Sequence, residues 1–195
     1  MHGELARIFA EQPSIRPGEL LTLLNRYVFL TMSSHSVYAT AICFRLDHRE
    51  GRLEYASGGH PPAFIRTADG RLEQLDSTSF VLGAVPPDDF HAEPRTLRFA
   101  IGDALIAYTD GLTEARDQHG RMFGVDGLRR ALINPTLDAE GSMLPGINRA
   151  VAGHRFGPTE DDILIIEIRC PVAPAVAHPS APAGGSAPRP ARPRA

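Results

Sequence analysis

The sequence contains no lysine, and all 20 of its basic residues are arginine. Together with the abundant alanine, glycine and proline, this is typical of a GC-rich coding sequence and carries no functional meaning. The charge balance is also weak, with a net charge of -3 and an isoelectric point near 6.2. Nucleic acids and anionic membrane surfaces attract proteins with a strong basic excess, so neither is expected as a partner.

Cysteines and long apolar runs are scarce as well. The two cysteines, Cys43 and Cys170, show neither metal-ligand spacing nor a disulfide framework, which favours a reducing compartment. No apolar stretch approaches the roughly 18 residues that a membrane-spanning helix needs. The first residues also lack the charged-then-apolar pattern of a signal peptide. We therefore expect a cytoplasmic protein without direct membrane contact.

The length and composition favour one folded domain followed by a tail. The chain has 195 residues, of which 43% are hydrophobic, enough for a single sizeable core. Residues 171–195 change to proline, alanine, glycine, serine and arginine without periodicity, so they are predicted to be disordered. The predicted domain is therefore residues 1–170.

Apolar spacing predicts helices combined with antiparallel hairpins, an α+β fold class. Asp69-Gly70 is the pair preferred in tight hairpin turns, and a turn-forming segment at 47–51 separates two other strand-like runs. Leucines at helical spacing follow Pro17, which is tolerated in a first helical turn. The expected strands are residues 37–46, 52–56, 63–67, 72–75, 96–99, 104–108 and 163–168. The expected helices are residues 3–11, 17–28, 125–133 and 139–154, with a short helical turn at 113–116.

Two acidic positions stand next to apolar strands. Asp110 follows the run at 104–108, and Gly111 behind it permits a sharp backbone turn. Asp161 precedes the last apolar run. If these strands are antiparallel neighbours, both carboxylates lie at one sheet edge, where oxygen ligands suit Mg²⁺ or Mn²⁺. The alternative is that both are ordinary turn acids.

The loop at 57–62 is a second candidate region. Its glycines allow close backbone approach and its prolines fix the exit direction, so Gly59 and His60 are expected to line a site wall. The alternative for His60 is a loop residue held by hydrogen bonds. Three residues carry hydroxyl groups that could act as nucleophiles: Ser57, Thr109 and Thr113. None of them lies in a recognised nucleophile motif.

The order of several short motifs carries a family resemblance. They are Gly58-Gly59-His60-Pro61-Pro62, Gly102-Asp103, Tyr108-Thr109-Asp110-Gly111-Leu112-Thr113-Glu114-Ala115, Phe123-Gly124 and Asp161-Asp162-Ile163. In this order and spacing, over about residues 3–169, the chain resembles the metal-dependent protein phosphatase (PPM) superfamily. The similar branch is the sporulation-type serine phosphatases, SpoIIE-like and RsbU-like.

The resemblance implies an antiparallel β-sandwich with helices on both outer faces, in α-β-β-α layers. Asp110 and Asp161 would be metal ligands, while Gly59, His60, Gly111 and Asp162 would be wall or turn positions. Two Mn²⁺ or Mg²⁺ ions would activate a water that attacks phosphoserine or phosphothreonine, with no further catalytic residue. The expected partner is a phosphorylated regulator of the STAS type (an anti-sigma-factor antagonist), and a sensor domain is expected upstream.

One departure from the family pattern bears on activity. The family's first metal ligands are aspartates that precede the first helix, and no aspartate occurs before Asp47 in this sequence. The expected domain is therefore truncated at its amino terminus, and this chain alone is not expected to hold both ions firmly. Two functions remain open: a phosphatase completed by upstream residues, or an inactive phosphatase-like module that binds a regulator.

Overall fold

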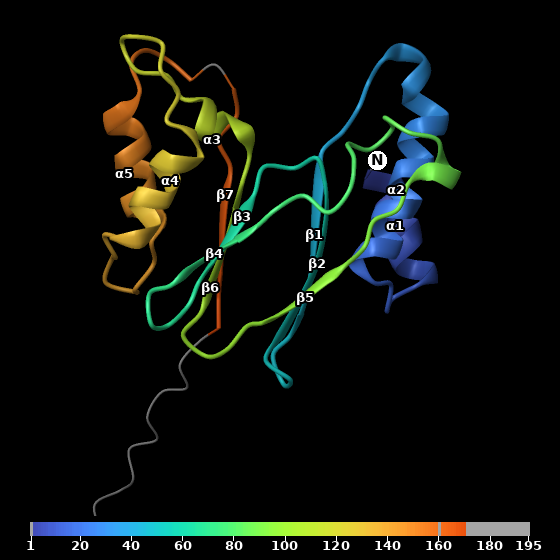
Figure 1. Cartoon of the computed structure of the whole chain (residues 1–195), viewed down its shortest axis with the longest axis horizontal. Helices are drawn as coiled ribbons and strands as arrows, with labels where there is room; N and C mark the ends of the chain where they lie inside the picture. The colour runs from blue at the N-terminus through green and yellow to red at the C-terminus, as the bar shows by residue number, and fades with distance from the viewer. Residues whose placement is uncertain (1, 160, 171–195) are drawn as a thin grey trace, which may run out of the picture.

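The computed structural model describes residues 2–159 and 161–170, and the predicted tail at 171–195 lies outside the described residues. Two antiparallel sheets pack face to face, and helices cover both outer faces (Figure 1). The layers therefore follow the order helix, sheet, sheet, helix. This confirms the α+β sandwich that the resemblance implied.

The first sheet has three strands in the order β1-β2-β5. They are β1 (Ala41–Asp47), β2 (Arg52–Gly58) and β5 (Arg95–Arg98). The helices α1 (His2–Glu11) and α2 (Pro17–Met32) lie on its outer side, and Pro17 occupies the first turn of α2 as the sequence predicts. A short 3-10 helix, η1 (Ser33–His35), follows α2, and another, η2 (Pro87–Asp89), precedes β5.

The second sheet has four strands in the order β4-β3-β6-β7. They are β3 (Ala63–Arg66), β4 (Leu72–Leu75), β6 (Ala104–Tyr108) and β7 (Ile165–Arg169). Its outer face carries α4 (Gly124–Ile133) and α5 (Leu144–His154), and the short α3 (Asp110–Glu114) follows β6 directly. Both predicted hairpins are confirmed, as β1 with β2 and β3 with β4.

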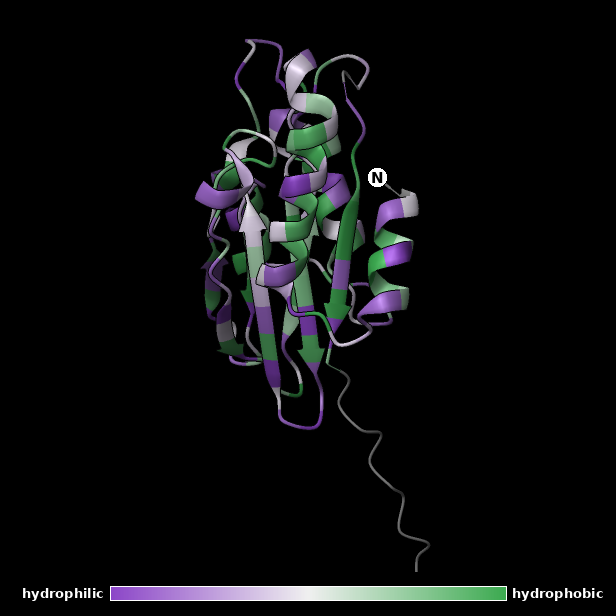
Figure 2. Ribbon diagram, turned by 90° about the vertical axis from the view of Figure 1, so that its right-hand side faces the viewer, coloured by the Kyte–Doolittle hydropathy of each residue, from purple (hydrophilic) through white to green (hydrophobic). Residues whose placement is uncertain are grey.

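The strand period of two residues divides the core into separate apolar clusters. On β3, Phe64 packs toward α4 and α5, whereas its neighbour Ile65 packs between the two sheets. A third cluster, which includes Leu21 and Val28, joins α2 to the outer face of the first sheet. Figure 2 shows the resulting alternation of hydrophobic and hydrophilic residues along the strands.

The predicted start of the last helix is wrong. The sequence suggested a helix over 139–154, but α5 begins at Leu144, so Pro145 lies in its first turn. The first N–H groups of a helix have no partner within the helix, and a proline costs nothing there. None of the helices in the described part of the chain combines the length and apolar character needed to cross a membrane.

Candidate functional site at the β6–β7 edge

Strands β6 and β7 bring the two predicted acids to one edge of the second sheet. The strands pair antiparallel, with Tyr108 at the end of β6 opposite Ile165 at the start of β7. Asp110 follows β6 and Asp161 precedes β7, so both acids lie beyond the same strand ends. The antiparallel pairing that was the condition for a shared edge is therefore present, while the role of the acids as metal ligands stays a prediction.

Asp110 is the first residue of a helix rather than part of a simple turn. Thr109 is the N-cap residue, with extended dihedrals (φ -82°, ψ 156°), and α3 begins at Asp110. The short helical turn predicted at 113–116 is therefore misplaced. The Thr113 hydroxyl donates a hydrogen bond to the Asp110 carbonyl oxygen at 3.0 Å, and Asp110 Oδ1 accepts one from the Gly111 N–H at 3.1 Å. Thr113 therefore stabilises this first turn.

Gly111 is required for a reason that the sequence did not reveal. It does not lie among the glycines with positive φ, so the predicted sharp turn is not what favours glycine. A Cβ at this position would lie 2.7 Å from the Asp162 carbonyl oxygen and 3.3 Å from the Asp161 carbonyl carbon. Glycine therefore lets α3 approach the backbone that carries both acids of the Asp161-Asp162 pair.

Thr109 fastens the two strand ends together. Its hydroxyl donates to the Asp162 carbonyl oxygen at 2.8 Å and accepts from the Leu164 N–H at 2.9 Å. Its backbone N–H also donates to the Leu164 carbonyl oxygen at 3.0 Å. Because the hydroxyl is committed to two backbone groups, Thr109 is a structural clamp rather than a nucleophile. Sequence reasoning missed this role, because Leu164 and Asp162 are distant in the chain.

The carboxylates of Asp110 and Asp161 are both exposed, and they supply only part of a metal centre. Asp161 Oδ1 accepts a hydrogen bond from the Asp162 N–H at 2.7 Å, and the Asp162 side chain is also exposed. Within residues 2–159 and 161–170, no group of three or more histidine, cysteine or acidic side chains could hold a metal ion. Two divalent ions placed close together need bridging anions to offset their repulsion. The described residues therefore do not fit a complete two-ion site.

The loop with Gly59 and His60 is fixed by contacts of its own. Gly59 has a φ of 66°, and a Cβ there would lie 2.3 Å from Val81 Cγ2, so only glycine fits. His60 Nδ1 donates to the carbonyl oxygen of Pro61 at 2.8 Å. In the described structure its ring makes no hydrogen bond to Asp110 or Asp161. The interpretation of His60 as a hydrogen-bonded loop residue therefore has the geometric support.

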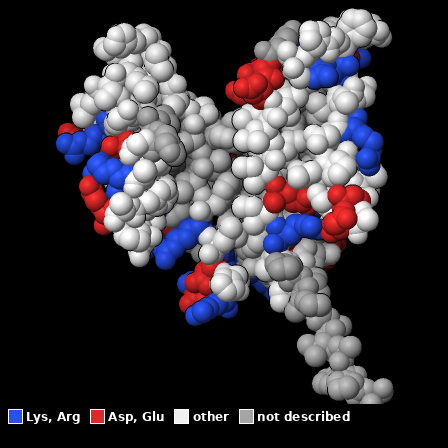
Figure 3. Space-filling view, turned by 180° about the vertical axis from the view of Figure 1, so that it is seen from behind, with Lys and Arg blue, Asp and Glu red and all other residues white. Residues whose placement is uncertain are grey.

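A small cavity beside Asp161 adds two arginines that sequence reasoning did not single out. Its volume is about 40 Å³, and Arg116 and Arg155 line it together with Glu114 and Asp161. Figure 3 shows a notch between the two halves of the sandwich at one end of the molecule, with acidic side chains on one rim. Nothing in the local sequence of Arg155 marks it, because its place depends on how α5 packs.

The layered fold and the acids at one sheet edge define the class of protein, a PP2C-type phosphatase fold. The SiaA-PP2C domain of Pseudomonas aeruginosa superposes with a TM-score of 0.69 at 20% identity, covering 86% of this chain and 66% of that domain. A Bacillus subtilis structure of the SpoIIE PP2C domain with part of its regulatory domain gives a TM-score of 0.70 at 19% identity, covering 88% and 48%. These similarities concern the fold.

The sequence comparisons give the family. The model for "Stage II sporulation protein E (SpoIIE)" matches residues 1–171, and the chain belongs to this family of PPM phosphatases. Protein IcfG of Synechocystis is 31% identical over 147 residues, covering 75% of this chain and 23% of that protein. The phosphoserine phosphatase RsbP of Bacillus subtilis is 27% identical over 154 residues, covering 77% and 37%. The chain thus spans less than half the length of these curated relatives.

Proposed function

We propose that this chain acts in the hydrolysis of phosphoserine or phosphothreonine on a regulatory protein in bacterial signalling. The observation that carries the proposal is the clamped β6–β7 edge, where Asp110 and Asp161 extend from neighbouring strand ends. Family membership supports it, because the relatives RsbP and RsbU are named phosphoserine phosphatases. The partner we propose is a phosphorylated regulator of the STAS type.

Asp110 and Asp161 are oxygen donors of the kind that Mn²⁺ and Mg²⁺ prefer. In this reaction class, such ions lower the pKa of a bound water and offset the charge of phosphoryl oxygens. The described residues supply two of the carboxylates, and further ligands would have to come from groups outside the described residues. This chain therefore contributes these two acids to the site.

A second function is favoured by one observation. The described residues hold no group of three or more possible metal ligands, as expected for a module that binds a regulator without hydrolysing it. In that case the notch and its acidic rim would serve recognition alone. The two functions differ in one measurable property, the metal-dependent release of phosphate.

The test measures phosphate release from a phosphoserine peptide at millimolar Mn²⁺ by the protein in its full natural length and by two variants of it. Asp110→Asn should abolish the release, because an amide is a much weaker metal ligand than a carboxylate. Asp126→Asn, an exposed position in the first turn of α4, should leave it unchanged. Release that persists in Asp110→Asn would rule out the metal-ligand assignment. A protein of full natural length that binds a phosphorylated STAS protein but releases no phosphate would establish the binding module instead.

A further inference from the structure

Two arginines from distant parts of the chain face one small cavity at the candidate site. Arg116 follows α3, Arg155 follows α5, and both line the cavity of about 40 Å³ beside Asp161. A volume of this order accepts only a small group, since about 10–15 Å³ of such space holds one water molecule. The cavity therefore suits a small side-chain group rather than a large ligand.

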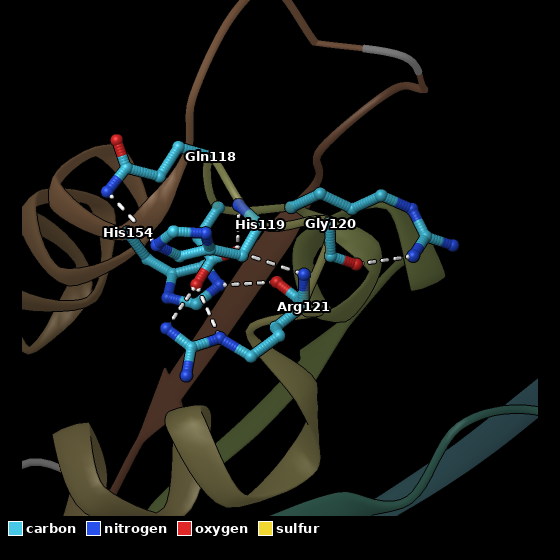
Figure 4. Close-up of polar contacts among 7 residues, drawn as sticks. Gln118, His119, Gly120, Arg121 and His154 are labelled. Carbon is cyan, nitrogen blue, oxygen red and sulfur yellow. Dashed lines mark hydrogen bonds and ion pairs between the residues drawn. The ribbon is translucent and has the colours of Figure 1, made fainter.

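Backbone contacts hold the two arginines together. The Phe156 N–H donates to the Arg116 carbonyl oxygen at 2.8 Å. His154 precedes Arg155, and its Nε2 donates to the Arg121 carbonyl oxygen at 2.9 Å (Figure 4). Arg155 is thus flanked on both sides by hydrogen bonds to the segment that follows α3. Its position relative to Arg116 is fixed before any partner binds.

The segment that follows α3 is itself well ordered by hydrogen bonds. Arg116 Nη1 donates to the Gly120 carbonyl oxygen at 2.9 Å. Asp117 Oδ1 accepts from the backbone N–H groups of His119 at 2.8 Å and Arg121 at 2.9 Å. One nitrogen of the Arg116 guanidinium is therefore occupied, and its remaining N–H groups are available to a ligand.

Arg155 lines the cavity without a charged partner among the described residues. Its side chain is half-buried, and among the described residues it forms no ion pair and no side-chain hydrogen bond. Asp161 and Glu114 line the same cavity, yet neither is paired with it. Partial burial of a guanidinium without a charged partner is unfavourable, and a carboxylate satisfies its planar donors with two parallel hydrogen bonds.

We propose that this cavity is a subsite for a carboxylate of the partner protein, from an acidic side chain next to its phosphoserine, with Arg155 as the anchor. This inference rests on the proposed function, because it names a chemical feature of the substrate of that same site. Arg155 acts as a specificity residue that positions the substrate. It contributes no chemistry to the hydrolysis.

The test is a binding cycle that needs no catalysis. Two labelled phosphoserine peptides, identical except for glutamate or glutamine on either side of the phosphoserine, are titrated with the chain in EDTA buffer by fluorescence anisotropy. Arg155→Gln should weaken binding of the glutamate peptide roughly tenfold and leave the glutamine peptide unchanged, as expected for loss of one charge-assisted contact. Arg155→Lys should retain part of the preference, because it keeps the charge but not the planar donors.

Arg149→Gln is the matched control, since it removes the same side chain from an exposed position of α5. It should affect both peptides equally. The inference is overturned if Arg155→Gln weakens both peptides alike, or if the effect of Arg149→Gln equals that of Arg155→Gln. If Arg155→Gln loses the preference for the glutamate peptide but the protein still hydrolyses both peptides with equal efficiency, the phosphatase proposal stands. A preference measured in EDTA, together with no phosphate release from either peptide by the protein of full natural length at millimolar Mn²⁺, would keep the subsite and count against the phosphatase.

Discussion

Thr109 and Asp162 are joined by a hydrogen bond of 2.8 Å from the threonine hydroxyl to the aspartate carbonyl oxygen, across more than fifty residues of chain. The same hydroxyl accepts the Leu164 N–H at 2.9 Å. One oxygen atom therefore connects the end of β6 to the segment that enters β7. The position of Asp161 relative to Asp110 depends on this clamp.

Thr109→Val should destabilise the fold by about 0.5–1.5 kcal/mol, because it removes two hydrogen bonds to backbone groups while preserving the side-chain shape. Urea denaturation followed by circular dichroism measures the free energy of unfolding. Thr96→Val on the exposed strand β5 is the control and should change it by less than about 0.5 kcal/mol. Equal effects of the two substitutions would show that Thr109 is not a clamp.

Gly111→Ala should destabilise the protein by about 1–3 kcal/mol, because the new methyl group would lie 2.7 Å from the Asp162 carbonyl oxygen and force the acidic segment to move. The control is Gly153→Ala in α5, where a Cβ has nothing within 4 Å. It should stabilise the helix by up to about 1 kcal/mol. A thermal melt of each variant gives the comparison, and a stabilised Gly111→Ala protein would contradict the close approach.

Tyr108→Phe should stabilise the protein by about 1 kcal/mol. The Tyr108 side chain is buried, and its hydroxyl has no hydrogen-bond partner among the described residues, so removal of the oxygen relieves a desolvation cost. Urea denaturation near neutral pH measures the change. Tyr38→Phe, at a residue that is 54% exposed, should be close to neutral. A destabilised Tyr108→Phe variant would reveal a partner for the hydroxyl.

The same residue should make the protein sensitive to alkali. Burial raises the pKa of Tyr108 from 10.0 to about 12. Because the folded-state pKa lies above the unfolded value, this contribution to stability is complete below pH 10 and is lost as the pH rises toward 12. The unfolding midpoint should therefore fall less steeply with pH in Tyr108→Phe than in the original protein over this range. Parallel curves would contradict the buried, neutral phenol.

Mn²⁺ should bind the isolated chain weakly and without a two-ion stoichiometry, because Asp110 and Asp161 alone cannot offset the repulsion of two close divalent ions. Isothermal titration calorimetry measures the affinity and the number of ions. Asp161→Asn should remove the residual binding, whereas Asp126→Asn should retain it. Tight binding of two ions by the unmodified chain would show that the described side chains rearrange to form a complete site.

Local signals in the sequence predicted much of the fold. Asp69-Gly70 marked a hairpin, Pro17 marked the start of a helix, and the apolar runs before Asp110 and after Asp161 marked paired strands. Each of these depends on neighbouring residues and on the period of the element. The sequence could therefore bring both acids to one sheet edge on the condition that the two strands are antiparallel neighbours, and the structure shows this pairing.

The missed features depend on contacts between distant segments. The sequence suggests that Gly111 is a turn glycine. In the structure, the carbonyl of Asp162 occupies the space that a side chain at this position would need. Nothing in the sequence distinguishes Arg155 from other arginines, and the role proposed for it depends on the hydrogen bonds that join its neighbours to the segment after α3. No pattern within a short window could have predicted these contacts.

The pairing of β7 with β6 also sets the time at which the site can form during synthesis. The partner of β6 on this side is made only after α3, α4 and α5 have been translated. At about 5–20 residues per second, a nascent chain would carry an unclamped Thr109 and an uncovered β6 edge for several seconds. Chaperone binding or misfolding of ribosome-bound chains should therefore be greatest in the interval before the β7 segment leaves the exit tunnel.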